Sequence, residues 1–452
     1  MKIRLAKPGH MIFPNAYAST NKPYRALRRL FFLLALLFCL FYQGQAQRIP
    51  LRFYLEKDSS SYAGLRLTGQ VWMRYNQNNP GTLINGEPSP GFFDISVRRL
   101  RFQTYARIRE KTNLTLTLGQ NNINYLTARS GEIRLLDFYV DHRLHRNLTV
   151  GGGQSGWNGT SRFAAPLTSK LLTLDVSPFL IPTVNQTDNI LRKLSAFLAG
   201  QAGAWDYRVV FSRPYAPVEN TAPVPDSRFA GLKPGMQTAA YVKYQFFEHE
   251  SLSPFHPGTY DGEKKILALG LGIEKQNRAM WHLNAASDTV TSAITLFAAD
   301  IFGELPGYND KAWTFYLGYF YYDFGPNYLR VIGFNNVGNG TNERGTFSGT
   351  GNAWPAIGTG HTGHFQLAHT WKIPGRTEKI QPFVSGQYSV YEKLQEPVRY
   401  LEGGVNLLFD GQRSKVSLAF QNRPVFDANP VGSLVQYQRR TAVVLQYQLR
   451  LE

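Results

Sequence analysis

Three arginines, Arg99, Arg101 and Arg107, stand at odd positions of one short stretch and together could bind anions. A guanidinium group is permanently charged and donates paired hydrogen bonds that suit a carboxylate or a phosphate. Because alternate side chains of a strand point to the same face, a strand over residues 99–108 would place the arginines on one face, with about 7 Å between every second side chain. Its other face would be apolar, beginning with Leu100.

The elements that would position these arginines are strands, because apolar and polar residues alternate repeatedly along the chain. The alternating segments are 62–75, 99–108, 112–120, 136–143, 148–154, 193–201, 205–212, 237–247, 264–275, 290–302, 313–323, 328–333, 362–371, 380–388, 400–409, 415–421 and 437–451. Tight turns alternate with long polar loops between them, a contrast typical of outer-membrane barrels. The sequence predicts an all-β fold, a transmembrane antiparallel β-barrel of about sixteen strands within a range of 16–18; the segment near Tyr328 is the weakest.

The composition agrees with a barrel that encloses water. Hydrophobic residues make up 43% of the 452 residues, and a helical membrane protein would be more apolar, whereas half of each barrel strand is polar. The net charge is +18, and residues 1–46 carry seven basic and no acidic residues, so 18 − 7 = +11 remains for the rest. This balance favours outer-membrane lipid and anionic solutes as partners. No nucleic-acid-binding motif accompanies it.

The first residues have the order of a secretory signal. Basic residues precede an apolar run over 30–42, and small residues follow up to Ala46. We expect a signal peptide over 1–46 and a barrel over 47–452, exported to the bacterial outer membrane. A membrane anchor is the alternative, although a spanning helix needs about 20 apolar residues. The single cysteine, Cys39, lies in the leader, so no disulfide is expected.

Residues 155–190 interrupt the alternation and contain several prolines and apolar residues. A stretch of this length without a strand pattern is usually functional or disordered, and its apolar residues favour packing. We expect a constriction loop that folds into the lumen, with Arg162 and Lys170 as its candidate solute contacts. Just before it, three glycines at 151–153 indicate a close backbone approach or a kink.

The polar strand faces would line the lumen, because a charge facing lipid costs about 2–4 kcal/mol at the middle of the membrane. The predicted pore-lining cations are Arg66, Arg74, Arg99, Arg101, Arg107, Arg143, Lys243 and Lys372. Two roles for the arginines stay open and are compatible. They could pass an anion from one to the next, or they could form a structural ladder with Asp137, Asp141 and Glu132.

Aromatic residues gather in two groups, which are predicted to form girdles at the two membrane interfaces. The groups are Tyr316, Tyr319, Phe320, Tyr321, Tyr322 and Phe324, and Tyr241, Tyr244, Phe246 and Phe247. The rim of a soluble sandwich core is the alternative interpretation.

Several segments resemble the phosphate-selective porin O and P family of Bacteroidetes-type outer-membrane porins. The longest are 92–102, 136–141 and 148–154, with shorter similarities at 401–406 and 415–420. The resemblance implies a sixteen-stranded, usually trimeric barrel that passes small solutes and often favours anions. It also implies that lumen arginines and lysines, together with basic residues of a constriction loop, provide selectivity.

The sequence therefore predicts an outer-membrane porin for passive diffusion of small hydrophilic solutes, with a preference for anions and with phosphate as a candidate solute. No cofactor, metal or enzymatic activity is expected, since the histidine group His361, His364 and His369 follows a strand and its loop without partner ligands. Two alternatives remain: an outer-membrane barrel enzyme of the phospholipase or protease type, and a secreted β-sandwich adhesin.

Overall fold

The computed structural model describes residues 51–57, 60–126, 132–156, 159–182, 192–214 and 222–452. The predicted signal peptide lies outside these residues. The regular structure consists of strands together with short 3-10 helices, among them η2 (Arg162–Ala164), η3 (Thr168–Lys170) and η4 (Pro178–Leu180). None of the helices within these ranges has the length and apolar character needed to span a membrane.

Sixteen strands form one antiparallel sheet that closes on itself where β23 pairs with β2. They are β2 (Tyr62–Gln77), β5 (Gly91–Ile108), β6 (Thr112–Ile123), β7 (Arg134–His145), β8 (Leu148–Ser155), β9 (Lys193–Ala202), β10 (Trp205–Ser212), β12 (Gln237–Gln245), β13 (Ile266–Leu283), β14 (Thr289–Pro306), β15 (Ala312–Asp323), β19 (Gly360–Lys372), β20 (Lys379–Tyr391), β21 (Val398–Asp410), β22 (Ser414–Ala428) and β23 (Leu434–Leu451). Closure removes the free edges of a sheet, so the strands satisfy one another's backbone groups. The predicted sixteen-stranded barrel is confirmed.

The remaining strands are short and extend or decorate the barrel. β1 (Arg52–Tyr54) pairs with β2, and β11 (Arg228–Phe229) pairs with β13. Two small sheets lie outside the barrel sheet: β16 (Leu329–Ile332) with β18 (Trp354–Gly358), and β3 (Thr82–Ile84) with β4 (Glu87–Pro88) and β17 (Gly340–Thr341). The weakest predicted strand, near Tyr328, therefore forms β16 and does not contribute to the barrel wall.

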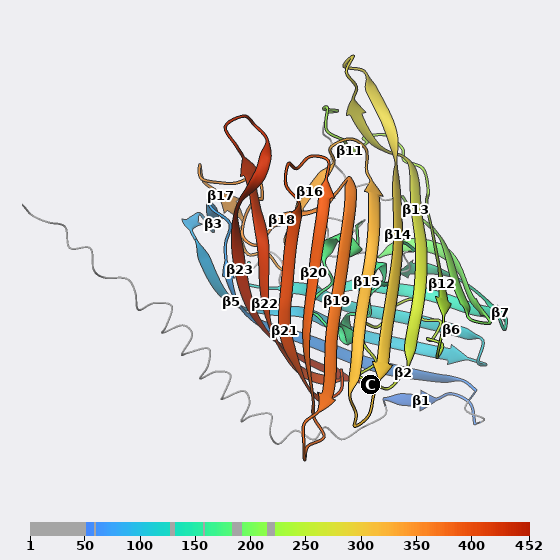
Figure 1. The fold of residues 1–452 in the computed structure, drawn as a ribbon. Coiled ribbons are helices and arrows are strands. Elements are labelled where there is room, and N and C mark those ends of the chain that lie inside the picture. Colours follow the sequence, from blue (N-terminus) through green and yellow to red (C-terminus); the bar gives the residue numbers. More distant parts are fainter. Residues whose placement is uncertain (1–50, 58–59, 127–131, 157–158, 183–191, 215–221) are drawn as a thin grey trace, which may run out of the picture. The chain divides into compact units, whose positions relative to one another are not determined.

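The two ends of the barrel differ in the length of their connections (Figure 1). Short turns join β5 to β6, β7 to β8, β9 to β10 and β21 to β22 at the end where β2 begins and β23 finishes, which we call the turn end. The opposite end, the loop end, carries the longest connections, although short turns join β13 to β14, β20 to β21 and β22 to β23 there. At the turn end, residues 246–265, between β12 and β13, form a long segment. We call it the tucked segment, because it folds into the barrel.

Apolar side chains form the outer surface of the wall. Along β13, Leu269, Leu271 and Ile273 are 43%, 48% and 49% exposed, whereas Ala268, Glu274 and Gln276, on the opposite face of the same strand, are buried inside. The same alternation exposes Phe365 and Leu367 on β19. An apolar outer face on a closed barrel is what a lipid bilayer requires, and these strands define a transmembrane β-barrel.

The aromatic residues of β15 lie on both faces of the wall. Tyr319 and Tyr321 are exposed on the outer face, but Tyr316, Phe320 and Tyr322 are buried inside the barrel. Phe324, just after the strand, is buried as well, so the prediction that the whole group forms a membrane girdle is wrong for four of its six members. Consecutive strand residues point to opposite faces, so a continuous aromatic run cannot lie on one face.

The three glycines of β8 confirm the predicted close approach. Gly153 has φ of +129°, a conformation that L-residues other than glycine rarely adopt. A Cβ atom there would lie 2.2 Å from the carbonyl oxygen of Phe138 and 2.7 Å from the Cα of Tyr139. Glycine at 153 thus permits β7 and β8 to pair tightly.

Candidate functional site: an arginine-lined constriction

Residues 159–182 fold inside the barrel, and the polar inner wall holds their backbone. Carbonyl oxygens of the loop accept hydrogen bonds from Gln70, Gln448, Lys415, Asn406 and Tyr322, which lie on five different strands, at 2.8–3.1 Å. Buried carbonyls without partners would each cost about 1–3 kcal/mol. The wall side chains thereby satisfy loop carbonyls that lie inside the barrel.

Apolar residues of the loop fill one part of the lumen. Phe163, Phe179, Leu180 and Ile181 pack with inward residues of β14, β15 and neighbouring strands in one buried cluster that includes Phe320. The ring of Phe179 meets that of Phe320 edge-on, with 5.0 Å between the centroids. Packed side chains fill this part of the lumen. Open space remains elsewhere along the wall.

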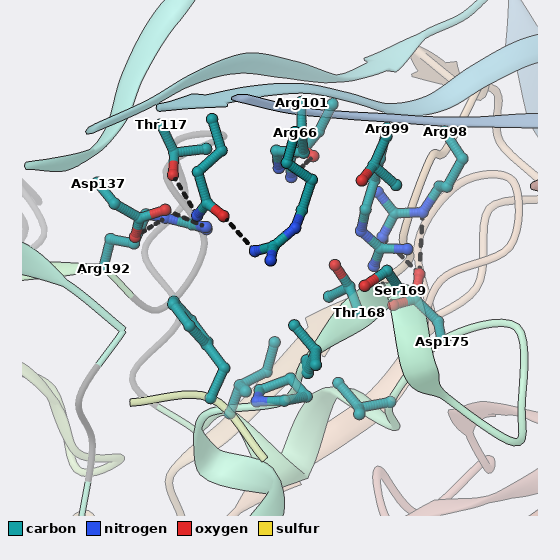
Figure 2. Close-up of a pocket in the computed structure, with 18 of the residues that line it drawn as sticks. Arg66, Arg98, Arg99, Arg101, Thr117, Asp137, Thr168, Ser169, Asp175 and Arg192 are labelled. Atoms are coloured by element: carbon teal, nitrogen blue, oxygen red, sulfur yellow. Dashed lines mark hydrogen bonds and ion pairs between the residues drawn. The ribbon is translucent and has the colours of Figure 1, made fainter. Parts of the chain in front are cut away.

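The open space nearest the arginines is a cavity of about 90 Å³, which we call the central cavity (Figure 2). Its cations are Arg66, Arg98, Arg99, Arg101 and Arg192. Its other lining residues include Pro166, Leu167, Thr168, Ser169, Val176 and Ile181 of the loop, together with Phe255 and Phe334. One wall is therefore rich in guanidinium groups, and the facing loop is apolar or carries hydroxyl groups.

Arg98 and Arg99 both enter this cavity because a β-bulge interrupts β5. Gln70 of β2 pairs with Arg99, but Val71 pairs with Val97, so Arg98 is the extra residue. A bulge redirects side chains by breaking the strict alternation. Sequence analysis missed Arg98 for this reason, although two adjacent arginines within an alternating run are a signal for a bulge.

Asp175 of the loop binds both of these arginines. Arg98 donates from Nε and Nη2 to Oδ2 of Asp175 at 2.9 and 2.5 Å, and Arg99 donates from Nη2 to Oδ1. Burial by itself would raise the pKa of Asp175, but the two guanidinium groups outweigh it and hold this pKa below its ordinary value of 3.8. The carboxylate is therefore charged at neutral pH.

The other arginines of the cavity donate hydrogen bonds to neutral groups in one case and to carboxylates in the others. Arg101 donates to the carbonyl oxygens of Leu100 and Gln120, both at 2.9 Å, and these acceptors are neutral. Arg66 donates to Glu452 at 2.8 Å, and Arg192 donates to Asp137 at 2.8 and 3.0 Å. The lining of the central cavity contains five arginines and two carboxylates, Asp137 and Asp175, so positive charge prevails.

Two further cavities lie toward the ends of the barrel. The loop-end cavity, of about 40 Å³, is lined by Arg74, which is fixed by Asp94 at 2.9 and 3.2 Å, and by Trp72, Ser385, Tyr400 and Glu402 among others. The turn-end cavity, of about 240 Å³, is lined by Arg107, Arg143, Lys111 and Asp141 among others. Predicted cations therefore line all three cavities.

Two predicted cations, Lys243 and Arg162, are instead buried beneath the tucked segment. Lys243 donates to Glu250 of that segment at 2.7 Å and lies 3.7 Å from Asp206. Arg162 donates to both carboxylate oxygens of Glu250 at 2.7 and 2.6 Å. Both side chains connect segments of the chain inside a packed region, and neither lines the central cavity.

The last two predicted cations, Lys372 and Lys170, lie outside the lining of the central cavity. Lys372, the final residue of β19, has a side chain that is 45% exposed and lies 3.8 Å from Asp310 in a turn, so the structure places it at the rim. Lys170 ends η3, where its carbonyl oxygen accepts a hydrogen bond from the backbone of Gly258 at 2.7 Å. Neither lines the central cavity.

The three histidines of β19 do not form a common site. His361 lies on the exposed face beside the hydroxyl group of Tyr319, at 2.7 Å, whereas His364 is buried against the ring of Phe179. Within the ranges that the structure describes, no group of three or more potential metal-binding side chains is found.

The fold and the cavities define a class, a transmembrane β-barrel with a narrow, arginine-rich lumen. No known protein-family model matches the chain, and no curated protein sequence matches it. The resemblance to the phosphate-selective porin O and P family therefore stays a prediction.

Among solved structures, the chain is similar to the outer membrane channel DcaP of Acinetobacter baumannii, at 11% identity over 87% of this chain and 99% of that chain, with a TM-score of 0.48. It is also similar to outer-membrane expressed OmpT of Vibrio cholerae, at 8% identity over 88% of this chain and 100% of that chain, with a TM-score of 0.46. A trimer form of in-vitro folded OmpT matches at 9% identity, 86% and 99% coverage, and a TM-score of 0.45. These likenesses concern the fold alone.

Proposed function

We propose that the chain is a porin of the bacterial outer membrane that lets small hydrophilic solutes diffuse passively and favours anions, with phosphate among the candidates. The observation that carries the proposal is the charge of the central cavity, where five arginines face the lumen with two carboxylates. In a narrow space with little water, charges interact more strongly than in bulk solution. Such a lining favours entry of anions and disfavours cations.

The proposal extends to export, assembly and activity. The leader over residues 1–46 is removed after Ala46, the apolar outer surface contacts outer-membrane lipid, and three copies assemble as a homotrimer. The proposed activity is passive passage, with no enzymatic step. Native mass spectrometry in detergent is expected to show trimers of chains that begin at Gln47; monomers, or chains that keep the leader, contradict these parts.

Planar-bilayer recordings test the channel function. The mature protein is expected to give discrete conductance steps and, under a KCl gradient, a reversal potential that indicates anion preference. Arg101→Gln removes a guanidinium group of the central cavity, and the anion-to-cation permeability ratio is expected to fall. Lys372→Gln is the matched control, since it removes one positive charge at the exposed rim, and is expected to leave the ratio nearly unchanged.

Two results would contradict the proposal in different ways. Absence of steps from protein shown to be folded and inserted would remove the channel function. Steps with no ion preference, unchanged by Arg101→Gln, would leave a general porin and reduce the arginines to supports of the wall.

A further inference from the structure

Asp175 lies between two cavities of the lumen. It lines the central cavity with Arg98 and Arg99, and it also lines the loop-end cavity with Trp72 and Tyr400. The contact between Asp175 and the two arginines therefore lies at the boundary between the two cavities. Figure 2 shows the carboxylate of Asp175 pointing from the loop toward Arg98 and Arg99 on the wall.

Arg98 and Arg99 together hold the carboxylate of Asp175. Arg98 presents Nε and Nη2 to one oxygen of Asp175, and Arg99 presents Nη2 to the other oxygen. Further contacts orient the two guanidinium groups: Arg98 donates to Asn122 at 2.8 Å, and Arg99 donates to Gln70 at 2.8 Å. Adjacent, oriented guanidinium groups of this kind suit any carboxylate or phosphate.

The backbone on either side of Asp175 is fixed to the barrel wall. The N–H of Leu174 donates to Glu402 at 3.1 Å, and the hydroxyl group of Ser177 donates to Gln387 at 2.6 Å. The carbonyl oxygen of Asp175 accepts a hydrogen bond from Thr173 at 2.7 Å. With the backbone held in this way, rotation of the Asp175 side chain is the simplest change that frees the arginines.

We infer that Arg98 and Arg99 form an oxyanion-binding site which Asp175 occupies from within the chain, so that Asp175 controls passage between the loop-end and central cavities. This inference rests on the proposed channel function. An incoming phosphate or carboxylate competes with Asp175 for the two guanidinium groups, and the side chain returns once the anion has left. Cations gain nothing from this exchange, because they cannot replace a carboxylate on arginine.

A purely structural role for the ion pair gives a different expectation. If the pair serves only to attach the loop, removing the carboxylate charge leaves a loop that is still held through Leu174 and Ser177, and ion flow does not increase. If Asp175 occupies the anion site, removing its charge frees both arginines for solute anions. Conductance and anion preference should then rise together.

The test compares Asp175→Asn with Asp137→Asn in planar bilayers. Both variants remove one carboxylate from the lining of the central cavity, but Asp137 pairs with Arg192 and does not line the loop-end cavity. Asp175→Asn is expected to raise the single-channel conductance in KCl by about twofold or more, together with the anion-to-cation ratio. Asp137→Asn is expected to raise the ratio while the conductance stays close to that of the wild type.

The outcomes separate this inference from the channel function. Conductance of Asp175→Asn equal to that of the wild type, in folded and inserted protein, overturns the inference and leaves the porin intact. Equal increases in both variants also overturn it, because a general charge effect then explains the result. Absence of conductance in the wild type as well refutes the porin itself.

A second measurement decides the matter if Asp175→Asn does not fold. The ring of Trp72 lies 5.3 Å from the Arg98 guanidinium group, so its fluorescence reports on that site. Titration of the wild-type barrel with inorganic phosphate, and separately with acetate, is expected to change the emission in a saturable manner, and Trp72→Phe is expected to lose this change. Absence of a Trp72-dependent response to both anions overturns the inference.

Discussion

Arg162 and Glu250 form a buried ion pair between two segments that enter the barrel from opposite ends. The loop that carries Arg162 enters from the loop end, and the tucked segment that carries Glu250 enters from the turn end. Both nitrogens of the guanidinium fork donate to the carboxylate, at 2.7 and 2.6 Å, and the side chains are 1% and 2% exposed. Backbone hydrogen bonds between Leu167 and His256, and between His256 and Ala165, join the same two segments.

Breaking this pair is expected to destabilise the barrel. Glu250→Gln leaves the Arg162 charge buried without its carboxylate, and the loss expected for a buried pair is about 3–5 kcal/mol in the free energy of unfolding. Urea titration of the barrel in lipid vesicles, followed by tryptophan fluorescence, measures this change. Glu132→Gln is the control, because the pair of Glu132 with Arg134 is exposed and is expected to change stability by less than about 1 kcal/mol. Equal effects of the two variants would contradict the assigned role.

The pH dependence of conductance is expected to follow Asp175. Its pKa lies below the ordinary 3.8 because Arg98 and Arg99 outweigh the effect of burial. The carboxylate thus stays charged as the pH falls from 7 to 4, and the stability from the ion pair is lost only as the pH falls below 3.8 and through the lower pKa of the folded state. The ratio of wild-type conductance to that of Asp175→Asn is expected to be flat from pH 7 to 4 and to rise below pH 3.8. A rise beginning near pH 5 would show that this pKa is not lowered.

Neutralising Lys243 and neutralising Arg107 are expected to have different effects on stability and ion preference, although both side chains point inward. Lys243 is fully buried against Glu250, whereas Arg107 lines the turn-end cavity. Lys243→Met is expected to lower stability by about 3–5 kcal/mol, because it leaves Glu250 with one cation fewer in a buried site. Arg107→Gln is expected to leave stability within about 0.5 kcal/mol and to reduce anion preference, most clearly at low salt. Bilayer recordings at 0.1 M and 1 M KCl, with urea titrations, test both expectations.

A methyl group at position 153 is expected to disturb the pairing of β7 with β8. Gly153→Ala places a Cβ atom against the carbonyl oxygen of Phe138 at a backbone angle that alanine rarely adopts, so a loss of about 1–3 kcal/mol is expected. Gly363→Ala on β19 is the control, since no atom lies within 4 Å of its added Cβ. Thermal unfolding followed by gel mobility in detergent compares them. If Gly363→Ala were as destabilising as Gly153→Ala, crowding at 153 would not be the cause.

The sequence by itself determined the wall of the barrel. Alternation with a period of two places Arg99 and Arg101 on the face opposite Leu100 whatever the partner strands are, because the geometry of a strand is local. The same rule correctly predicts the exposed leucines of β13 and a count of about sixteen strands. The interruption of alternation after Gln154 also predicts a segment that packs within the lumen.

The tertiary structure alone decided which inward residues face open space. Lys243 and Arg101 both lie on alternating strands. The tucked segment buries Lys243 and leaves Arg101 in the lining of the central cavity. That burial depends on contacts between residues far apart in the sequence. Arg98 turned inward because the register between β2 and β5 shifts by one residue, which depends on both strands. The pairing of Asp175 with Arg98 likewise required the loop to fold across the lumen. Strand alternation is a property of neighbouring residues, whereas burial by another segment, strand register and ion pairing depend on contacts between residues that are far apart in the sequence.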